Sequence, residues 1–569
     1  MYKILLFSLL FVFQISLFSD WTKALGTLQN SDSLKKSYLS GMLLGESYGI
    51  YEVKNLKSKQ NVKDLYEINE NSLYWFDDSK ELNSNISNMI EAIHMSQSEG
   101  LDSSRYHIDE IEFIFKKISN GVIFDDRDQN LALIKLDILL SDAFFTLARD
   151  LSLGQINYKD FRNILYKKSK DENINHRWEA KVAEHDYVQL LQKAKEGGDF
   201  SEVIYSLVND NAIYNSLKDA YIRYKSIQDQ DGFQKISNGK NLKIGNVSNR
   251  VKELRIRLYQ SGDLDFVDED NKKFDKELRD GLKRFQKRVG IWPSGILNST
   301  TQKALNVSVQ KRLAKIKLNL ERSRWESDDF DFRYILVNIP EFMMHFKEGN
   351  ELLMNARVIV GKLKNPTPIF KADMSYIVLN PRWSVPNSIV SKEMLGKIQD
   401  DPYYLEDRNF KTYDRWTRKG RKEIDSFDVD WFQYDKNSKI PYNIVKEPGS
   451  SNPLGNVKFM FPNDHAVYIH DTPKKNLFKK SVRAFSHGCI RLHKPQKLLE
   501  FVSQGYLDSS YLDIKSKLNT GNNISLGLNE KIPVYVRYYT AYIDERGAVV
   551  FTKDVYGYDK IQEKLLLEK

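Results

Sequence analysis

The chain has 569 residues, more than one hydrophobic core usually organises, which predicts about three or four domains of roughly 150 residues each. Its 41% hydrophobic and 29% charged residues exclude a disordered, collagen-like or coiled-coil protein and favour packed globular domains. The formal net charge of +9 is too small an excess on this length to form a basic stripe, so no nucleic-acid partner is expected.

The N-terminus, residues 1–19, has the pattern of a secretory signal. A cationic start at Met1 to Lys3 is followed by the apolar run Ile4 to Phe18, and Ser19 precedes Asp20. We expect the protein to be exported to the periplasm or cell envelope. Leu17 is a poor residue three positions before Asp20, so an uncleaved membrane anchor stays an alternative. No later stretch reaches the ~18 to 20 apolar residues that a membrane span needs.

Residues 20–240 have mainly helical periodicity and predict a helical scaffold domain. The clearest helix is expected between Leu131 and Asp150, where apolar residues recur at spacings of three and four. The stretch from Gln228 to Asn249 is rich in Gly, Asn, Asp, Ser and Gln and predicts a linker.

Residues 242–306 predict a small domain of three helices. Val251, Leu254 and Leu258 fall on one helical face, and a second amphipathic helix ends in FQKRVGI. With the GDL turn, GIL and TTQKALN, this order resembles the peptidoglycan-binding type 1 repeat domain, although a generic three-helix bundle stays an alternative. A charged linker helix is expected over residues 307–332.

From residue 333 to residue 569 the apolar period becomes two, which predicts a mostly β domain and an α+β multidomain chain. Strands are expected at 334–346, 352–362 and 374–385, with KEGNE forming a hairpin between the first two. Residues 387–440 are irregular and rich in Tyr, Trp, Asp and Lys, so they predict an inserted cap. Strands resume at 442–445, 457–461 and 466–470, and residues 532–542 and 549–556 predict a hairpin that returns to the sheet.

The residues with most chemistry lie in YIHDTPKKNLFKKSVRAFSHGCIRLH, from Tyr468 to His493. Alternation along neighbouring strands would place Tyr468 and His470 opposite Cys489 and Arg491. The imidazole and guanidinium are expected to lower the pKa of the Cys489 thiol, the single cysteine of the chain. Gly488 allows a tight turn, and its N–H with that of Cys489 could face a developing oxyanion.

Metal binding is the alternative for Cys489 and for the histidines in and just before this segment. HExxH and CxxC spacings are absent from the sequence, and one cysteine excludes an all-thiolate cage. We therefore expect neither a metal nor an organic cofactor. The histidines concerned, besides His470, are His465, His487 and His493.

His470, fifteen intervening residues and then Ser486-His487-Gly488-Cys489 resemble the signature of the YkuD-type L,D-transpeptidases. NPLGNVKFMFPNDHAVYIHDTP, LNPRWSVP and the closing IPVYVRYYTAYIDERG resemble the large YcbB-type branch, which couples a helical scaffold, a peptidoglycan-binding module and a catalytic domain with an inserted cap.

The resemblance implies a role for each matching residue. Cys489 is the nucleophile and His470 its base, oriented by a backbone carbonyl near Asp471. Gly488 and Cys489 supply oxyanion N–H groups. His487 is a second possible base, a choice that the sequence leaves open. Supporting roles fall to Ser486, His487, Arg491 and Tyr468.

The implied activity is a cysteine acyl-enzyme that forms 3-3 cross-links between donor and acceptor stem peptides of peptidoglycan. If water replaces the acceptor amine, the same site is an L,D-carboxypeptidase or a cross-link hydrolase. A non-catalytic wall-binding scaffold is the alternative from another class. The sequence does not indicate a protein partner.

Overall fold

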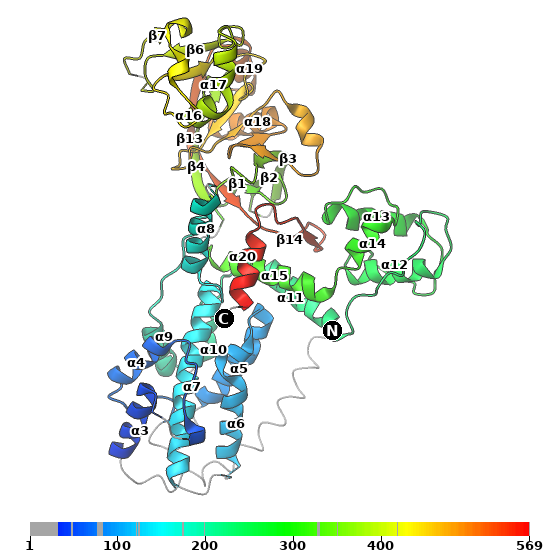
Figure 1. The fold of residues 1–569 in the computed structure, drawn as a ribbon. Helices are drawn as coiled ribbons and strands as arrows, with labels where there is room; N and C mark the ends of the chain where they lie inside the picture. The colour runs from blue at the N-terminus through cyan, green and yellow to red at the C-terminus, as the bar shows by residue number, and fades with distance from the viewer. Residues whose placement is uncertain are drawn as a thin grey trace.

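The computed structural model describes residues 32–567, apart from 47–48, 77–83, 121, 123–125, 173, 175, 198–199, 327–329, 350 and 418. The expected signal or anchor at residues 1–19 lies outside the described residues. Within the described ranges, no helix combines the length and the apolar character needed to cross a membrane. The structure is an α+β multidomain assembly, as the sequence predicts (Figure 1).

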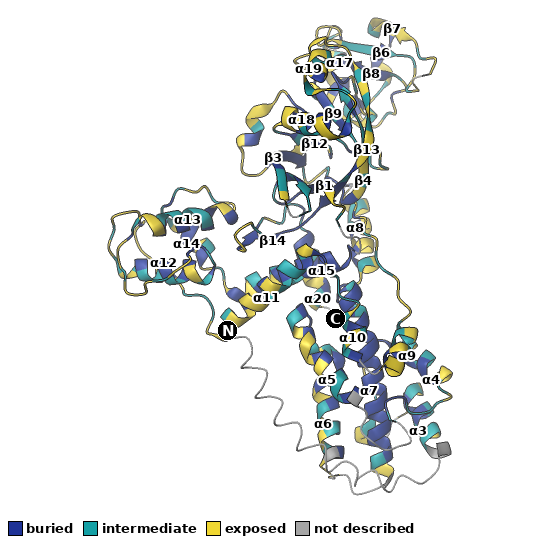
Figure 2. Ribbon diagram, turned by 180° about the vertical axis from the view of Figure 1, so that it is seen from behind, coloured by how far each residue is buried: buried dark blue, intermediate teal, exposed yellow. Residues whose placement is uncertain are grey.

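The helical domain is built around α7 (Asp126–Leu153), which contains the helix expected between Leu131 and Asp150. Almost every residue of α7 from Asn130 onward is buried, because shorter helices surround it (Figure 2). The surrounding helices are α3 (Asp32–Leu44), α4 (Lys59–Ile68), α5 (Ser84–Met95), α6 (Ile108–Ser119), α9 (Tyr187–Gly197) and α10 (Phe200–Tyr205).

Buried carboxylates on α7 hold the connections between these helices. Asp137 accepts hydrogen bonds from the backbone N–H groups of Tyr74 and Trp75. Asp142 accepts from the Ser58 N–H at 2.7 Å. Satisfying buried N–H groups in this way avoids the cost of leaving them unpaired, so these carboxylates stabilise loops that have little regular structure.

Part of the predicted scaffold leaves the helical domain and packs on the β domain. After α7 the chain enters α8 (Tyr158–Glu172), and Phe161 and Trp178 are buried in the same core as the sheet. Trp178 forms a parallel β-bridge with Ile369, and the Glu179 N–H donates to the Ile369 carbonyl. The sequence did not indicate that this segment packs on the β domain, because helical periodicity shows which face of a helix is apolar but not which core that face joins.

The three-helix domain matches its prediction. Its helices are α12 (Asn249–Gln260), α13 (Lys276–Arg288) and α14 (Ser299–Leu305). Each begins after a side-chain cap, Ser248, Asp275 or Asn298, which satisfies a first-turn N–H. Their apolar faces form a separate small core that includes Leu254, Leu282 and Phe285.

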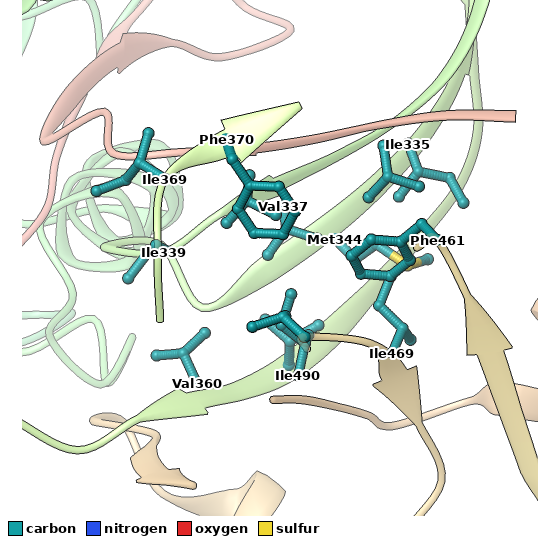
Figure 3. Packing of buried hydrophobic residues seen from close by; sticks show 14 of the residues in the cluster. Ile335, Val337, Ile339, Met344, Val360, Ile369, Phe370, Phe461, Ile469 and Ile490 are labelled. Atoms are coloured by element: carbon teal, nitrogen blue, oxygen red, sulfur yellow. The ribbon is translucent and has the colours of Figure 1, made fainter. Parts of the chain in front are cut away.

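A nine-stranded sheet forms the β domain, in the order β11-β3-β12-β10-β9-β4-β13-β1-β2. Because β2 also pairs with β3, the sheet closes into a barrel. Its core side chains, such as Met344, Phe461, Ile469 and Ile490, point toward one another (Figure 3). The strands are β1 (Arg333–Asn338), β2 (Met343–Glu348), β3 (Glu351–Gly361), β4 (Phe370–Leu379), β9 (Val457–Met460), β10 (Ile469–His470), β11 (Ala484–Ser486), β12 (Ile490–Leu492) and β13 (Ile524–Arg537).

The first expected strand, 334–346, is two strands, β1 and β2, joined by a turn in which Phe342 has a φ of 58°. The predicted hairpin between β2 and β3 is confirmed. Helices α18 (Pro495–Tyr506) and α19 (Tyr511–Asn519) follow the barrel strand β12, and Leu498 and Ile514 are buried in the barrel core.

The insertion is a small folded subdomain and not irregular chain. It has its own core, which includes Leu395, Trp431 and Ile444, and a separate sheet in the order β5-β8-β6-β7. Its elements are β5 (Trp383–Ser384), α16 (Asn387–Ile389), η5 (Val390–Met394), α17 (Leu395–Asp400), β6 (Phe410–Tyr413), β7 (Glu423–Ile424), η6 (Ser426–Asp428), η7 (Trp431–Gln433) and β8 (Asn443–Lys446). The folded unit thus extends beyond the expected bounds of 387 and 440.

The expected strand 532–542 is divided in two. Its first part, up to Arg537, belongs to β13 and lies in the large sheet as predicted, but the hairpin that follows does not return to this sheet, so that part of the prediction is wrong. Strands β14 (Ala541–Ile543) and β15 (Val549–Phe551) form a separate two-stranded sheet. Ala541, Val549 and Phe551 instead pack against α11 (Ala212–Asp229) and α15 (Val309–Arg324), which offer an apolar surface of their own. The alternation of residues along the strands predicts which side of the hairpin is apolar, but it does not predict which surface that side covers.

The expected linker helix, α15, lies at the centre of the molecule (Figure 1). Arg322 donates to Asp559 of α20 (Tyr558–Leu567) at 2.5 Å and to Thr540 beside the hairpin at 3.0 Å. Arg324 pairs with Glu321 at 3.1 Å and donates to the Tyr214 hydroxyl of α11 at 2.9 Å. Helix α15 therefore joins the helical domain to the β domain.

Replacing Arg322 with Met is expected to lower the free energy of unfolding by about 3 kcal/mol or more, because Asp559 would lose its closest cation inside the protein. Urea unfolding followed by circular dichroism measures the loss. Lys311→Met, at an exposed position of the same helix, is the matched control. A loss no larger than that of the control would contradict the central role of this ion pair.

Candidate active site

Strands β10 and β12 bring the predicted site residues together. They pair in parallel, with Ile469 opposite Ile490 and His470 opposite Arg491, and the Ile490 N–H donates to the Tyr468 carbonyl at 3.0 Å. Ile469 and Ile490 point into the barrel core, so alternation places His470 and Arg491 on its outer side. The expected arrangement of two neighbouring polar faces is confirmed.

The turn from Ser486 to Cys489 is held by its own hydrogen bonds. Ser486 Oγ donates to the Cys489 carbonyl at 2.6 Å and accepts from the Gly488 N–H at 3.2 Å. Gly488 has a φ of 118°, which side chains rarely adopt, so glycine is required there. The Gly488 N–H thus donates to Ser486 Oγ in this structure, and the oxyanion role of the Gly488 and Cys489 N–H groups stays a prediction.

Thr367 supports the turn from the barrel side. Its hydroxyl donates to the Gly488 carbonyl at 2.8 Å and accepts from the Gly361 N–H at the same distance. The Tyr556 hydroxyl donates to the Gly361 carbonyl at 2.9 Å. No motif in the sequence points to these two supporting side chains, because they come from distant parts of the chain.

The Cys489 thiol is half-buried and donates a long hydrogen bond, 3.8 Å, to the Ala466 carbonyl. Burial raises its pKa above the ordinary value of 9.0, although hydrogen bonds from Tyr468 and the charges of Lys458 and Arg491 favour the thiolate. The expected lowering of this pKa is therefore wrong for this structure. Desolvation outweighs the neighbouring charges, and the thiol is protonated at neutral pH.

His470 is a buried, neutral imidazole. Burial and the charge of Arg491 are the main causes that lower its pKa to about 3, against the hydrogen bond with the Asp471 carbonyl. Nδ1 lies 2.5 Å from that carbonyl, as expected, so Nδ1 carries the proton and Nε2 keeps a lone pair. At neutral pH the ring can accept a proton only at Nε2.

The position of Asp471 is itself fixed. Its carboxylate accepts from the Asn456 N–H at 3.0 Å and pairs with Lys475. Gly455, with a φ of 60°, leaves room for this carboxylate, since a Cβ there would lie 2.3 Å from Asp471 Oδ2. A chain of contacts thereby orients the His470 ring.

Lys458 is a site residue that the sequence analysis missed. It lies opposite His470 on β9, and its ammonium is 3.7 Å from the centre of the Tyr468 ring. The alternation in NVKFMF, which puts Val457 and Phe459 in the core, could have placed Lys458 on the site face. With Arg491, it makes the surroundings of the thiol cationic.

His487 points to the insertion. Its Nε2 lies 2.7 Å from Glu393 Oε1 of η5 and 3.2 Å from Lys362 Nζ at the end of β3. The Nε2 atom of His487 therefore contacts residues outside the Ser486–Cys489 turn and takes no part in the hydrogen bonds within it. The contact ties the subdomain to the residue two before Cys489.

The histidines of the metal-binding alternative are separated by their partners. His465 pairs with Glu179 and His487 with Glu393, while the His493 ring packs on Phe478. In the part of the chain that the structure describes, no three His, Cys, Asp or Glu side chains are grouped to hold a metal ion.

Alkylation of Cys489 by iodoacetamide is expected to accelerate with pH up to and beyond pH 9, without a plateau between pH 6 and 8, because the thiolate forms only above the ordinary thiol pKa. Tyr468→Phe should move the midpoint higher, since it removes a hydrogen bond that favours the thiolate. Intact-mass spectrometry follows the single adduct, and Cys489→Ala is the blank. A rate that is already maximal at pH 7 would contradict the protonated thiol.

Comparisons with known proteins match the parts of this chain separately. Residues 332–515 match the YkuD family, the L,D-transpeptidase catalytic domain; residues 60–220 match a scaffold domain; residues 247–305 match a family described as "Putative peptidoglycan binding domain". A curated protein of Haemophilus influenzae, "Putative L,D-transpeptidase", is 32% identical over 248 residues, which are 43% of this chain and 48% of that relative. The match therefore spans about half the relative's length.

Among solved structures, an L,D-transpeptidase from Mycobacterium smegmatis is 14% identical, with a TM-score of 0.17, over 36% of this chain and 58% of that one. An L,D-transpeptidase from Stackebrandtia nassauensis is 13% identical, with a TM-score of 0.20, over 53% of this chain and 96% of that one. These values are too low to inform the function. The family matches identify residues 332–515 as a YkuD-type L,D-transpeptidase catalytic domain, and they relate residues 60–220 to a scaffold domain and residues 247–305 to a peptidoglycan-binding domain.

Proposed function

We propose that the protein is an exported L,D-transpeptidase that forms 3-3 cross-links between peptidoglycan stem peptides through an acyl-enzyme on Cys489. The observation that carries the proposal is the parallel pairing of β10 with β12, which puts an oriented His470 opposite Arg491, on the strand that begins directly after Cys489. Tyr468, two residues before His470, hydrogen-bonds the thiol. The matched catalytic domain supports the reaction class.

In the acylation step, the Cys489 proton passes to His470 Nε2 as the sulfur attacks the carbonyl carbon of the donor's third stem residue. The C–N bond to the following D-alanine breaks, and the imidazolium returns the proton to the departing amine. The Cys489 N–H, with the nearby charges of Lys458 and Arg491, stabilises the oxyanion. Because burial keeps the free thiol protonated, the reaction needs His470 as a base to remove its proton.

In the transfer step, a side-chain amine of a second stem attacks the thioester carbonyl, and the thiol is regenerated. Water in place of the amine would give the carboxypeptidase or cross-link hydrolase alternative. We propose that the insertion is a cap that limits this water, because Glu393 joins it to His487 beside the nucleophile. Intact Cys489 and His470 argue against a non-catalytic scaffold.

Cys489→Ala is expected to abolish both acyl-enzyme and cross-linked product, because the mutated atom is the nucleophile. Purified muropeptides incubated with the wild type and the variant, and analysed by mass spectrometry, give the result. Cross-linked dimers in the wild type support transpeptidation, whereas tripeptides alone would establish the hydrolase. Undiminished dimer formation by the variant would overturn the mechanism.

His470→Ala is expected to slow acylation by about 10²- to 10⁴-fold, the usual effect of removing a general base. His487→Ala should cost less, because its Nε2 is held by the Glu393 carboxylate of the insertion. The rate is followed as the appearance of the acyl-enzyme mass, and matching circular dichroism spectra control for folding. A larger loss in His487→Ala would exchange the two roles.

A further inference from the structure

The loop between β9 and β10, residues 461–468, is held from inside by one side chain, that of Asn463. Its Nδ2 donates to the Phe461 carbonyl at 2.6 Å and to the Val467 carbonyl at 2.8 Å. Its Oδ1 accepts from the His465 N–H at 3.0 Å and from the Val467 N–H at 3.2 Å. These four hydrogen bonds, which we call the Asn463 clamp, use both donors and both acceptor sites of the side-chain amide.

The two ends of the loop are fixed independently of this clamp. Phe461 and Val467 are buried in the barrel core, and the Tyr468 carbonyl accepts an N–H from β12 at 3.0 Å. Strand β10, which carries His470, pairs with β9 on one side and with β12 on the other. What the clamp adds is therefore the path of residues 464–466 between these fixed ends.

Ala466, on this path, has a left-handed backbone with a φ of 52°. An alanine in this region is strained, because its Cβ crowds the backbone, and the conformation persists only where the surroundings impose it. The clamp holds both of its neighbours, His465 and Val467. The Ala466 N–H also donates to the backbone carbonyl of Asn463 at 3.3 Å, which closes the turn. These contacts together impose the left-handed conformation.

In this conformation the Ala466 carbonyl faces the nucleophile. It accepts the hydrogen bond of Cys489 Sγ at 3.8 Å. A hydrogen bond that a thiol donates stabilises the protonated form, and the carbonyl dipole disfavours a thiolate beside it. Tyr468 has the opposite effect, because its hydrogen bonds to Cys489 favour the thiolate. Ala466 and Tyr468, two residues apart, therefore act on the sulfur in opposite directions.

We propose that Asn463 is a positioning residue of the active site, whose side chain holds Ala466 in the left-handed conformation and so aims the Ala466 carbonyl at Cys489 Sγ. Asn463 acts through the backbone and not on the sulfur itself. The free enzyme then keeps its nucleophile as a hydrogen-bonded thiol, which reacts more slowly than a thiolate with adventitious electrophiles. The inference rests on the proposed function only in taking Cys489 as the nucleophile.

The test measures the rate of Cys489 alkylation by iodoacetamide against pH in the full-length protein, a readout that needs no peptidoglycan substrate. Asn463→Ala is expected to lower the midpoint of this profile by about half a pH unit, because the thiol loses the acceptor that stabilises its protonated form. The matched control is Asn523→Ala, which removes a 3.0 Å hydrogen bond from another asparagine amide to a backbone carbonyl, that of Asn380. A midpoint in Asn463→Ala that is not below that of the control overturns the proposal.

Ala466→Gly gives the second arm, because glycine adopts a left-handed backbone without the cost that a Cβ imposes. In the presence of Asn463 it should leave the midpoint at the wild-type value. Added to Asn463→Ala, it should recover part of the lowered midpoint, since the loop then reaches this conformation without the clamp. A general loosening that only exposes the thiol to water would not be corrected by glycine, so the absence of any recovery overturns the proposal.

Ala466→Val keeps the test decisive if Asn463→Ala does not fold. Ala466 is exposed, so a valine side chain there meets no packed core, but a β-branched residue is strongly disfavoured at a positive φ. The carbonyl should then turn away from the thiol although the clamp residue is intact. A lowered midpoint supports the proposal, and an unchanged midpoint overturns it.

Failure of the proposed function is recognised separately, by the absence of an acyl-enzyme and of cross-linked dimers when the wild type is incubated with muropeptides. The alkylation midpoints do not depend on that result, so they decide the role of Asn463 in either case.

Discussion

The buried ion pair between Arg322 and Asp559 is the constraint on which the arrangement of the domains depends. Two charges inside a protein are costly unless they meet each other with good geometry, so the pair fixes how α15 lies against α20. The same helix end carries Arg324, which reaches α11 through Tyr214. These partners come from the helical region, the hairpin region and the C-terminal helix. The polar network therefore fixes the positions of the separate hydrophobic cores relative to one another.

A consequence is that the catalytic domain does not stand alone. Trp178 and Glu179 belong to the scaffold in sequence, yet Trp178 is buried in the same core as the sheet and Glu179 pairs with His465, the residue before the Ala466 carbonyl that Cys489 contacts. On the other side, Glu393 connects the insertion to His487. The turn that carries Cys489 is therefore contacted by the barrel and by the insertion, and the neighbouring loop is contacted by the scaffold segment.

The sequence predicted the local parts well where periodicity is strong. The buried central helix, the three-helix domain and the pairing of polar faces on β10 and β12 follow from apolar spacing and motif order. Patterns failed where the partner surface is distant. The C-terminal hairpin covers α11 and α15 instead of the sheet, and the expected linker is a central buried helix, because alternation identifies an apolar side but not what it meets.

The sequence by itself determined the identity and order of the chemical groups: one thiol, an imidazole separated from the turn by fifteen residues, and the glycine that allows the turn. Only the tertiary structure decided the protonation states of these groups and the residues that hold them in place. Burial is a property of the folded surroundings, so the same residues that suggest an activated thiolate are a thiol of raised pKa and an imidazole of lowered pKa. Lys458, Thr367 and Glu179 likewise reach the region from distant segments, and no local pattern records such contacts.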